Sequence, residues 1–95
     1  MKILALEKEI RGVTDEQCES FLKAEAAQVW ELYRSGKLRE SYFRADRSQA
    51  VLIFECADVE ETRQLLATLP LVQEGLIGFE IVPLIPYPGF ARLFA

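Results

Sequence analysis

The chain has 95 residues, enough for one domain and too few for two, since most domains contain roughly 100 to 150 residues. Its formal net charge of -4 and its pI near 4.8 argue against nucleic acid as a partner, because proteins usually bind the phosphate backbone through clusters of Lys and Arg. No apolar run approaches the roughly 18 to 20 residues that span a bilayer, so we expect no membrane contact and a cytoplasmic location.

A strand and a helix are the first predicted elements. Residues 2–10 begin with a short apolar core and then turn charged, which predicts a strand of about six residues. Thr14 stands three residues before Gln17, the spacing of a capping box, and predicts that a helix begins there. Apolar residues then recur at three- and four-residue steps, and Gly36 is expected to end this helix as a left-handed cap.

Two strands are expected next, over residues 38–45 and 50–57. Residues 46–49 between them are polar and few enough for a hairpin, so the two strands should be antiparallel. The run Val51-Leu52-Ile53-Phe54 shows no alternation of apolar and polar residues, which is typical of a strand that is covered on both faces. We therefore expect the second of these strands to lie in the centre of a sheet.

A second helix and a last strand complete the predicted domain. Asp58 and Glu61 repeat the capping arrangement at the start of the helix, and Pro70 is expected to end it. The last strand, at residues 77–85, contains Pro83, which has no backbone donor and therefore indicates the edge of a sheet.

The order of these elements predicts an α+β fold of the ferredoxin-like type, βαββαβ. Right-handed crossovers place each helix between two parallel strands that leave a gap, so the four strands form an antiparallel sheet in the order 4-1-3-2. This order puts the last strand at an edge, as its proline requires. The first and third strands take the centre.

A second copy of the chain is the expected partner. Both helices of such a unit cover one sheet face, while the apolar strand at residues 51–54 also points to the other face. Hydrophobic residues make up 51% of the chain, a high share for a small domain. We therefore predict a homodimer or a higher homo-oligomer.

The chain is expected to divide into a ferredoxin-like α/β domain, residues 1–86, and a C-terminal arm, residues 87–95. The arm is much more apolar than a frayed terminus usually is. We predict that it packs at an oligomer interface on a neighbouring subunit. The alternative is that it folds back onto its own subunit.

The residue types restrict the available chemistry. The sequence contains no histidine, which removes the usual neutral-pH base and the commonest transition-metal ligand. Cys18 and Cys56 lack C-x-x-C spacing and are expected to be small buried hydrophobes. There is no Gly-rich phosphate loop and no carboxylate cluster at metal spacing, so no metal site is predicted.

Short motifs along most of the chain resemble those of one known family. They are Leu22-Lys23-Ala24-Glu25, Leu38-Arg39, Phe54-Glu55, Val59-Glu60, Leu69-Pro70-Leu71 and Phe79-Glu80-Ile81. In these residues, up to about Leu84, the chain is similar to the muconolactone isomerase group of dimeric α/β barrels. The resemblance implies a cofactor-free isomerase that moves a proton within a small unsaturated lactone or carboxylic acid, in homo-oligomers whose pockets lie between subunits.

Such a proton shift needs a base, an acid and a group that stabilises the enolate. The candidates are Glu7, Glu55 and Tyr42 for catalysis and Arg39, Arg44 and Trp30 for binding a small-molecule substrate. In the predicted sheet, Glu7 lies at the end nearest the hairpin that carries Arg44, and Glu55 lies at the opposite end near Arg39. The alternative for the strand residues is an ordinary ion pair or a solvated strand end, and for Trp30 it is packing.

Two other functions fit the sequence. In the first, the chain is a non-catalytic protein that binds a small ligand or serves in an assembly, and the charged residues only link strands. The second, cofactor-free oxygenation in a similar barrel, depends on the fold type alone.

Overall fold

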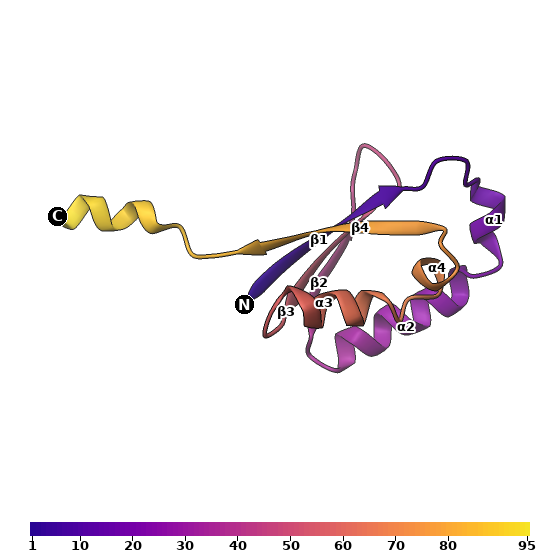
Figure 1. Cartoon of the computed structure of the whole chain (residues 1–95), viewed down its shortest axis with the longest axis horizontal. Coiled ribbons are helices and arrows are strands. Elements are labelled where there is room, and N and C mark those ends of the chain that lie inside the picture. Colours follow the sequence, from indigo (N-terminus) through magenta and orange to yellow (C-terminus); the bar gives the residue numbers. More distant parts are fainter.

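A four-stranded antiparallel sheet with helices on one face forms the body of the computed structural model, which describes all 95 residues (Figure 1). Its strands are β1 (Lys2–Glu9), β2 (Leu38–Phe43), β3 (Ala50–Glu55) and β4 (Ile77–Leu84). Its helices are α1 (Asp15–Glu19), α2 (Leu22–Arg34), α3 (Val59–Leu66), α4 (Pro70–Gln73) and the 3₁₀ helix η1 (Pro88–Phe94). The sheet order β2-β3-β1-β4 confirms the predicted ferredoxin-like arrangement, with β4 at an edge.

The predicted first helix is in fact two helices. Thr14 and Gln17 form the expected capping box at the start of α1. The helical ladder is then interrupted, because the amide of Phe21 bonds the carbonyl of Cys18, three residues back, and α2 begins afresh at Leu22. After α2, Gly36 has a φ of 82°, the left-handed conformation that the sequence predicts.

Pro70 begins a helix, which corrects the expectation that it ends one. Asp58 caps α3 as predicted, accepting the Glu61 amide at 2.8 Å, but α3 already ends at Leu66. Pro70 is the first residue of the short helix α4. A proline has no cost there, because the first amides of a helix have no partner within it.

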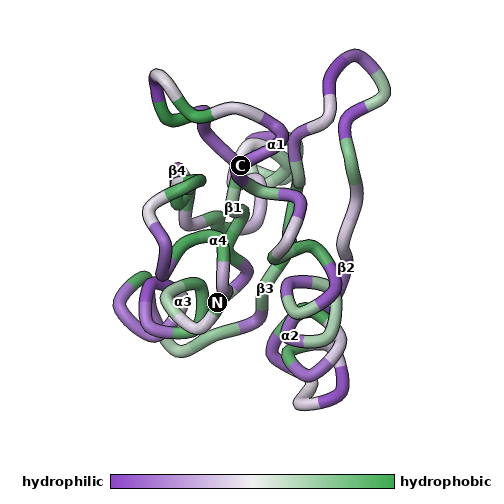
Figure 2. Tube along the Cα trace, turned by 90° about the vertical axis from the view of Figure 1, so that its right-hand side faces the viewer, coloured by the Kyte–Doolittle hydropathy of each residue, from purple (hydrophilic) through white to green (hydrophobic).

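The core lies between the sheet and its helices. Ile3 and Ala5 of β1 and Phe54 of β3 are fully buried on this face. The core cluster consists of Ile3, Ala5, Leu32, Leu38, Leu52, Phe54, Cys56, Leu66 and Leu69. Figure 2 shows hydrophobic residues along β1 and β3 inside the trace and hydrophilic residues in the connecting loops.

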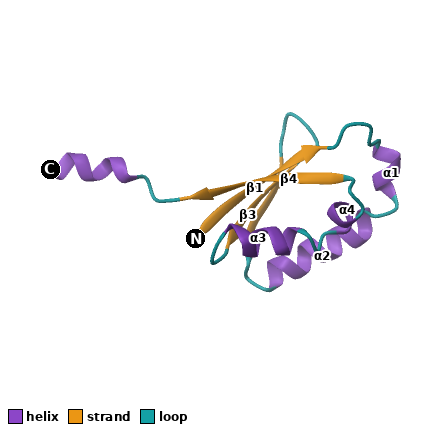
Figure 3. Cartoon of the chain, viewed as in Figure 1, coloured by secondary structure: helices purple, strands orange, loops and turns teal.

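The opposite face of the sheet has no covering element in the chain, as Figure 3 shows by placing α2, α3 and α4 on one side and α1 beyond the end of the sheet. The strand register brings together five half-buried apolar residues on this face: Leu4, Leu6, Val51, Ile53 and Val82. A partner on this face stays a prediction. Separately, none of the helices combines the length and the apolar character needed to cross a bilayer.

A bulge in β2 determines which of its side chains face the helices. Leu38 lies opposite Phe54, whereas Glu40 lies opposite Ile53, so Arg39 is an extra residue in the ladder. Past the bulge, Ser41 and Phe43 share the helix-facing side, and Tyr42 points to the open face with Val51. The bulge therefore changes which residues of β2 can reach a site between the sheet and the helices.

Candidate functional site

A pocket of about 650 Å³ lies between α2 and the helix-facing side of the sheet, at the end where β1 stops and β4 starts. Its lining is almost entirely hydrophobic. The polar exceptions are Glu7, Glu25 and Ser41, and no Lys or Arg lines it. A pocket of this size and character suits a small, largely apolar ligand with a few polar groups.

Glu7 reaches the pocket from β1. It follows Ile3 and Ala5 on the helix-facing side, in the part of β1 that extends past its pairing with β3. Its Oε1 accepts a hydrogen bond from the amide of Ala50, the first residue of β3, at 3.0 Å. The carboxylate is therefore held at a fixed position, and its Oε2 makes no hydrogen bond within the chain.

Glu25 reaches the same pocket from α2. Its Oε1 accepts the amide of Leu71 at 3.0 Å. Leu71 lies in the first turn of α4, where amides have no partner within the helix, and Leu69 supplies no side-chain cap. Glu25 thus caps α4 from a different helix, and its Oε2 remains free to meet a ligand.

Burial raises the pKa of both carboxyls. For Glu7, partial burial outweighs the lowering effect of the Ala50 amide, and Glu9 raises the pKa further. For Glu25, burial likewise outweighs the Leu71 amide, and the negative charge of Glu7 adds to the raised pKa. The pocket thus contains two carboxyls whose pKa values lie above the ordinary value, each mainly because of burial.

Aromatic side chains form the mouth of the pocket. Trp30 and Tyr33 of α2 are stacked with their ring centroids 5.7 Å apart, and both are more than half exposed. Phe43 of β2 lies across the pocket and is 72% exposed. This mouth can hold a planar ring between aromatic surfaces.

Of the residues that the sequence suggested, Glu7, Trp30 and Tyr42 line the pocket, and Arg44 does not. The Arg44 guanidinium binds the carboxylate of Asp46 in the β2–β3 hairpin, at 2.8 and 2.6 Å, and is well exposed. Arg44 and Glu7 therefore do not meet in this chain.

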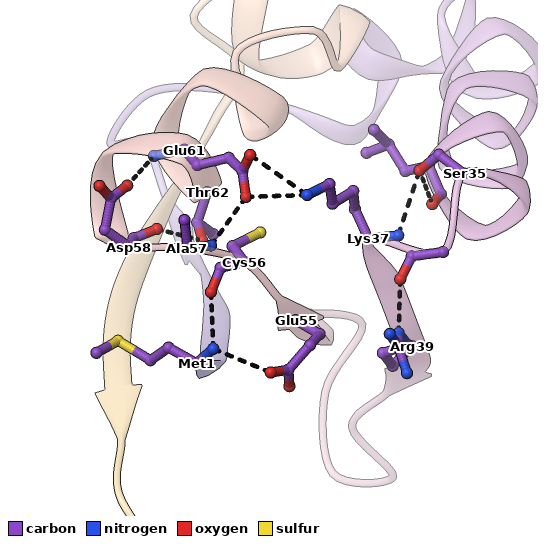
Figure 4. A network of polar contacts seen from close by, with 12 residues as sticks. Met1, Ser35, Lys37, Arg39, Glu55, Cys56, Ala57, Asp58, Glu61 and Thr62 are labelled. Atoms are coloured by element: carbon purple, nitrogen blue, oxygen red, sulfur yellow. Dashed lines mark hydrogen bonds and ion pairs between the residues drawn. The ribbon is translucent and has the colours of Figure 1, made fainter.

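Glu55 and Arg39 lie at the other end of the sheet (Figure 4). The Glu55 carboxylate binds the amino group of Met1 at 2.9 Å, and this ion pair is the main cause of its lowered pKa. Arg39 Nε donates to the carbonyl of Gly36 at 2.5 Å. Neither residue reaches the pocket that contains Glu7.

Tyr42 contributes to the edge of the pocket, but its hydroxyl is engaged elsewhere. The hydroxyl donates to Glu40 Oε1 at 2.7 Å on the open face of the sheet, and this bond raises the pKa of Tyr42. The bulge at Arg39 is the cause, because it turns Tyr42 away from the side on which Glu7 lies.

Sequence reasoning missed Glu25 as a site residue. Glu25 lies three residues after Leu22 and four before Val29, which places it inside the apolar stripe of α2. A carboxylate within such a stripe is a signal, since charged residues are rarely buried without a purpose or a partner. What the sequence does not reveal is that Glu7 lies opposite.

The raised pKa of Glu25 predicts how stability changes with pH. A carboxyl with a raised pKa binds more protons folded than unfolded, so stability falls as pH rises from its ordinary value of 4.5 through the folded value. Glu25→Gln keeps an acceptor for the Leu71 amide and removes this titration. Above pH 4.5, its free energy of unfolding should increasingly exceed that of the wild type, as measured by urea unfolding from acidic to neutral pH.

Glu55→Gln is the matched control with the opposite sign. The lowered pKa of Glu55 contributes stability above pH 4.5 that is lost as pH falls through the folded value. Glu55→Gln should therefore lose a little stability at neutral pH and approach the wild type in acid. Wild-type and Glu25→Gln curves that stay parallel over the whole range would contradict the assignment.

Comparison with known proteins agrees with this fold. The model of the muconolactone delta-isomerase family matches residues 6–89. A solved structure of muconolactone isomerase aligns with a TM-score of 0.73 at 20% identity, covering 93% of this chain and 92% of that one. At such low identity the structural likeness shows the fold alone.

A second solved structure is similar. It is 5-chloro-2-hydroxyhydroquinone dehydrochlorinase from Burkholderia phenoliruptrix AC1100, in complex with 2,5-dihydroxybenzoquinone. It aligns with a TM-score of 0.71 at 16% identity, covering 94% of this chain and 98% of that one. No curated protein matches the sequence.

Proposed function

Since the chain belongs to the muconolactone delta-isomerase family, we propose that it is a cofactor-free isomerase that moves a proton within a small unsaturated lactone or carboxylic acid. The observation that supports this most strongly is the pair of carboxyls with raised pKa, Glu7 and Glu25, in an apolar pocket. Proton transfer at carbon is favoured by a base and an acid whose pKa values lie closer to neutral than those of exposed carboxyls.

In the proposed reaction, Glu7 is the base and Glu25 the acid. The ionised Glu7 carboxylate removes a proton from the carbon next to the far end of the conjugated C=C bond, and the electron pair moves through that bond onto the carbonyl oxygen as a dienolate. Glu25 then gives its proton to the carbon next to the carbonyl, and the C=C bond shifts. We assign the proton to Glu25 because it is half-buried and lies on the same pocket as the carboxylate of Glu7. Transfer of one proton from Glu7 back to Glu25 restores the starting state.

The enolate oxygen needs hydrogen-bond donors. Ser41 and Tyr33 both line the pocket, and each has a side-chain hydroxyl. Their hydroxyls can therefore turn toward a bound carbonyl oxygen, and donors aimed at a developing oxyanion are among the largest contributions to catalysis.

The functional unit that we propose is a homodimer or larger homo-oligomer of the dimeric α/β barrel type. The half-buried apolar residues on the open sheet face, among them Leu6, Val51 and Ile53, support packing of a second sheet there.

The direct test follows deuterium from solvent into substrate. The protein is incubated with muconolactone and related butenolides in D₂O, and incorporation at carbon is measured by NMR. We expect incorporation and a shifted C=C bond, at a rate well above the rate without protein. If the protein instead released chloride from a chlorinated hydroquinone and caused no exchange, Glu7 would be the base of an elimination reaction. Quenching of Trp30 fluorescence by these lactones with no exchange would favour a non-catalytic binding protein.

A further inference from the structure

The pocket lacks a positive charge, although its proposed reaction develops negative charge on the substrate. Its ionisable lining residues are carboxyls and tyrosines, with no Lys or Arg among them. Arg44 is bound to Asp46, and Arg39 lies at the other end of the sheet. One chain therefore builds a site that is electrostatically incomplete for an anionic intermediate.

The C-terminal arm, residues 87–95, is apolar and positively charged, whereas the charged residues of the pocket are acidic. Arg92 is its only charged side chain. Tyr87, Phe90 and Leu93 follow at three-residue steps, which places them on one side of a 3₁₀ helix. All three are at least 65% exposed, and Tyr87 packs edge-on against Phe90 at 5.0 Å, so the arm offers a preformed apolar stripe.

The arm does not lie near the pocket of its own chain. Glu7 is at the end of β1 where β4 begins, whereas the arm follows the far end of β4, beside Lys2. From Lys2 to Glu7 there are five residue steps along β1, roughly 17 Å at the usual strand rise. Figure 1 shows η1 extending away from α1 and α4, and the radius of gyration of 15.3 Å exceeds the roughly 12 Å of a compact domain of this length.

We propose that the C-terminal arm of a second copy closes the pocket and brings its Arg92 to the bound substrate. The exposed aromatic mouth formed by Trp30, Tyr33 and Phe43 matches the apolar stripe of the arm. The charges are complementary, because the only charged residues that line the pocket are acidic and the only charged side chain of the arm is basic.

This inference deepens the proposed function and specifies its substrate class. With Arg92 in place, the site binds substrates that carry a carboxylate or develop an enolate, because a guanidinium hydrogen-bonds such oxygens in bidentate fashion. The residue would act in the neighbouring site, and no single chain would have a complete one.

Trp30 makes the docking step measurable without any activity, because it is the only tryptophan and lies at the mouth. The reporter is the full-length chain with Phe90→Asp and Leu93→Asp, whose own arm cannot dock. The donor is full-length Trp30→Phe, which is free of tryptophan and has an intact arm. Mixing excess donor with reporter should move the Trp30 emission to shorter wavelength and reduce its quenching by acrylamide.

The matched control donor carries Trp30→Phe together with Phe90→Asp and Leu93→Asp, and it should leave the reporter unchanged. Equal emission with both donors would overturn the proposal, since the arm would then fold back on its own subunit or remain free. A wild-type protein whose Trp30 is as accessible to acrylamide as that of the reporter would overturn it as well.

The role of Arg92 is tested separately with Arg92→Gln in the full chain. This variant should still protect Trp30 in the mixing experiment, while its rate of deuterium exchange into muconolactone falls about 10²- to 10³-fold, the usual loss for one oxyanion donor. Arg92→Lys should recover part of the rate. An unchanged rate in Arg92→Gln would overturn the assignment of Arg92. If the wild type showed no exchange, the proposed isomerase activity would be refuted. The fluorescence experiment would still decide whether the arm docks on a second copy.

Discussion

Glu25→Gln is expected to lower the rate of solvent exchange into muconolactone by about 10²- to 10⁴-fold, the range that a positioned acid or base contributes. The amide oxygen of glutamine can still accept the Leu71 hydrogen bond, so the cap on α4 is preserved. What disappears is the proton that Glu25 would deliver. The loss should therefore appear in kcat, while the chain remains folded.

Glu31→Gln is the matched control on the same helix. Glu31 is exposed, binds Arg34 and does not line the pocket, so its replacement should leave the exchange rate unchanged. Glu7→Gln should be as damaging as Glu25→Gln, and the double variant hardly worse than either, because residues that act as one unit are not additive. Full activity in Glu25→Gln with loss in Glu55→Gln would move the acid to the other end of the sheet.

The pH dependence of the reaction gives a second check on this pair. With one carboxyl ionised and the other protonated in the active state, the rate should pass through a maximum between two apparent pKa values that belong to the pair. Burial raises both pKa values, so the descending side should lie above the range of an exposed carboxyl. Glu7→Gln should abolish both the activity and its dependence on pH.

The fold was predictable because local signals and global topology agree. The capping residues Thr14 and Asp58 mark where helices begin, and the unbroken apolar run at residues 51–54 marks the central strand. Pro83 marks the edge strand, since a proline has no amide for the ladder. Pro70 was misinterpreted because a proline after an apolar stripe can equally begin the next helix.

The site was less predictable, because its geometry depends on features without a sequence signal. The bulge at Arg39 reverses the alternation of β2, so Tyr42 and Ser41 exchange the sides that strict alternation from Leu38 assigns to them. Glu25 and Glu7 are 18 positions apart (25 − 7) and meet only because α2 folds back across the end of β1. The position of Glu7 on its strand was enough to predict it as a site residue. That Glu25 lies opposite it could be seen only in the three-dimensional structure.

Phe54→Ala is expected to lower the free energy of unfolding by about 3–5 kcal/mol, the usual cost of truncating a buried Phe. Phe54 is fully buried and lies opposite Ile3 on β1 and Leu38 on β2, which are also buried. The strands on either side fix the backbone around it, so the cavity cannot close by a simple shift. Since domains of this kind are stable by only about 5–15 kcal/mol, the variant should lose a large share of its stability.

Phe43→Ala is the matched control, because it makes the same chemical change on an edge strand at a side chain that is 72% exposed. With Phe90→Asp and Leu93→Asp in the background, so that no arm docks over the mouth, it should cost no more than about 0.5 kcal/mol. Both variants are compared with the wild type by urea unfolding at one protein concentration, since subunit association makes apparent stability depend on concentration. A loss below about 1 kcal/mol for Phe54→Ala would mean that β3 is not the centre of the core. A loss at Phe43 as large as that at Phe54 would mean that a partner subunit buries the mouth of the pocket.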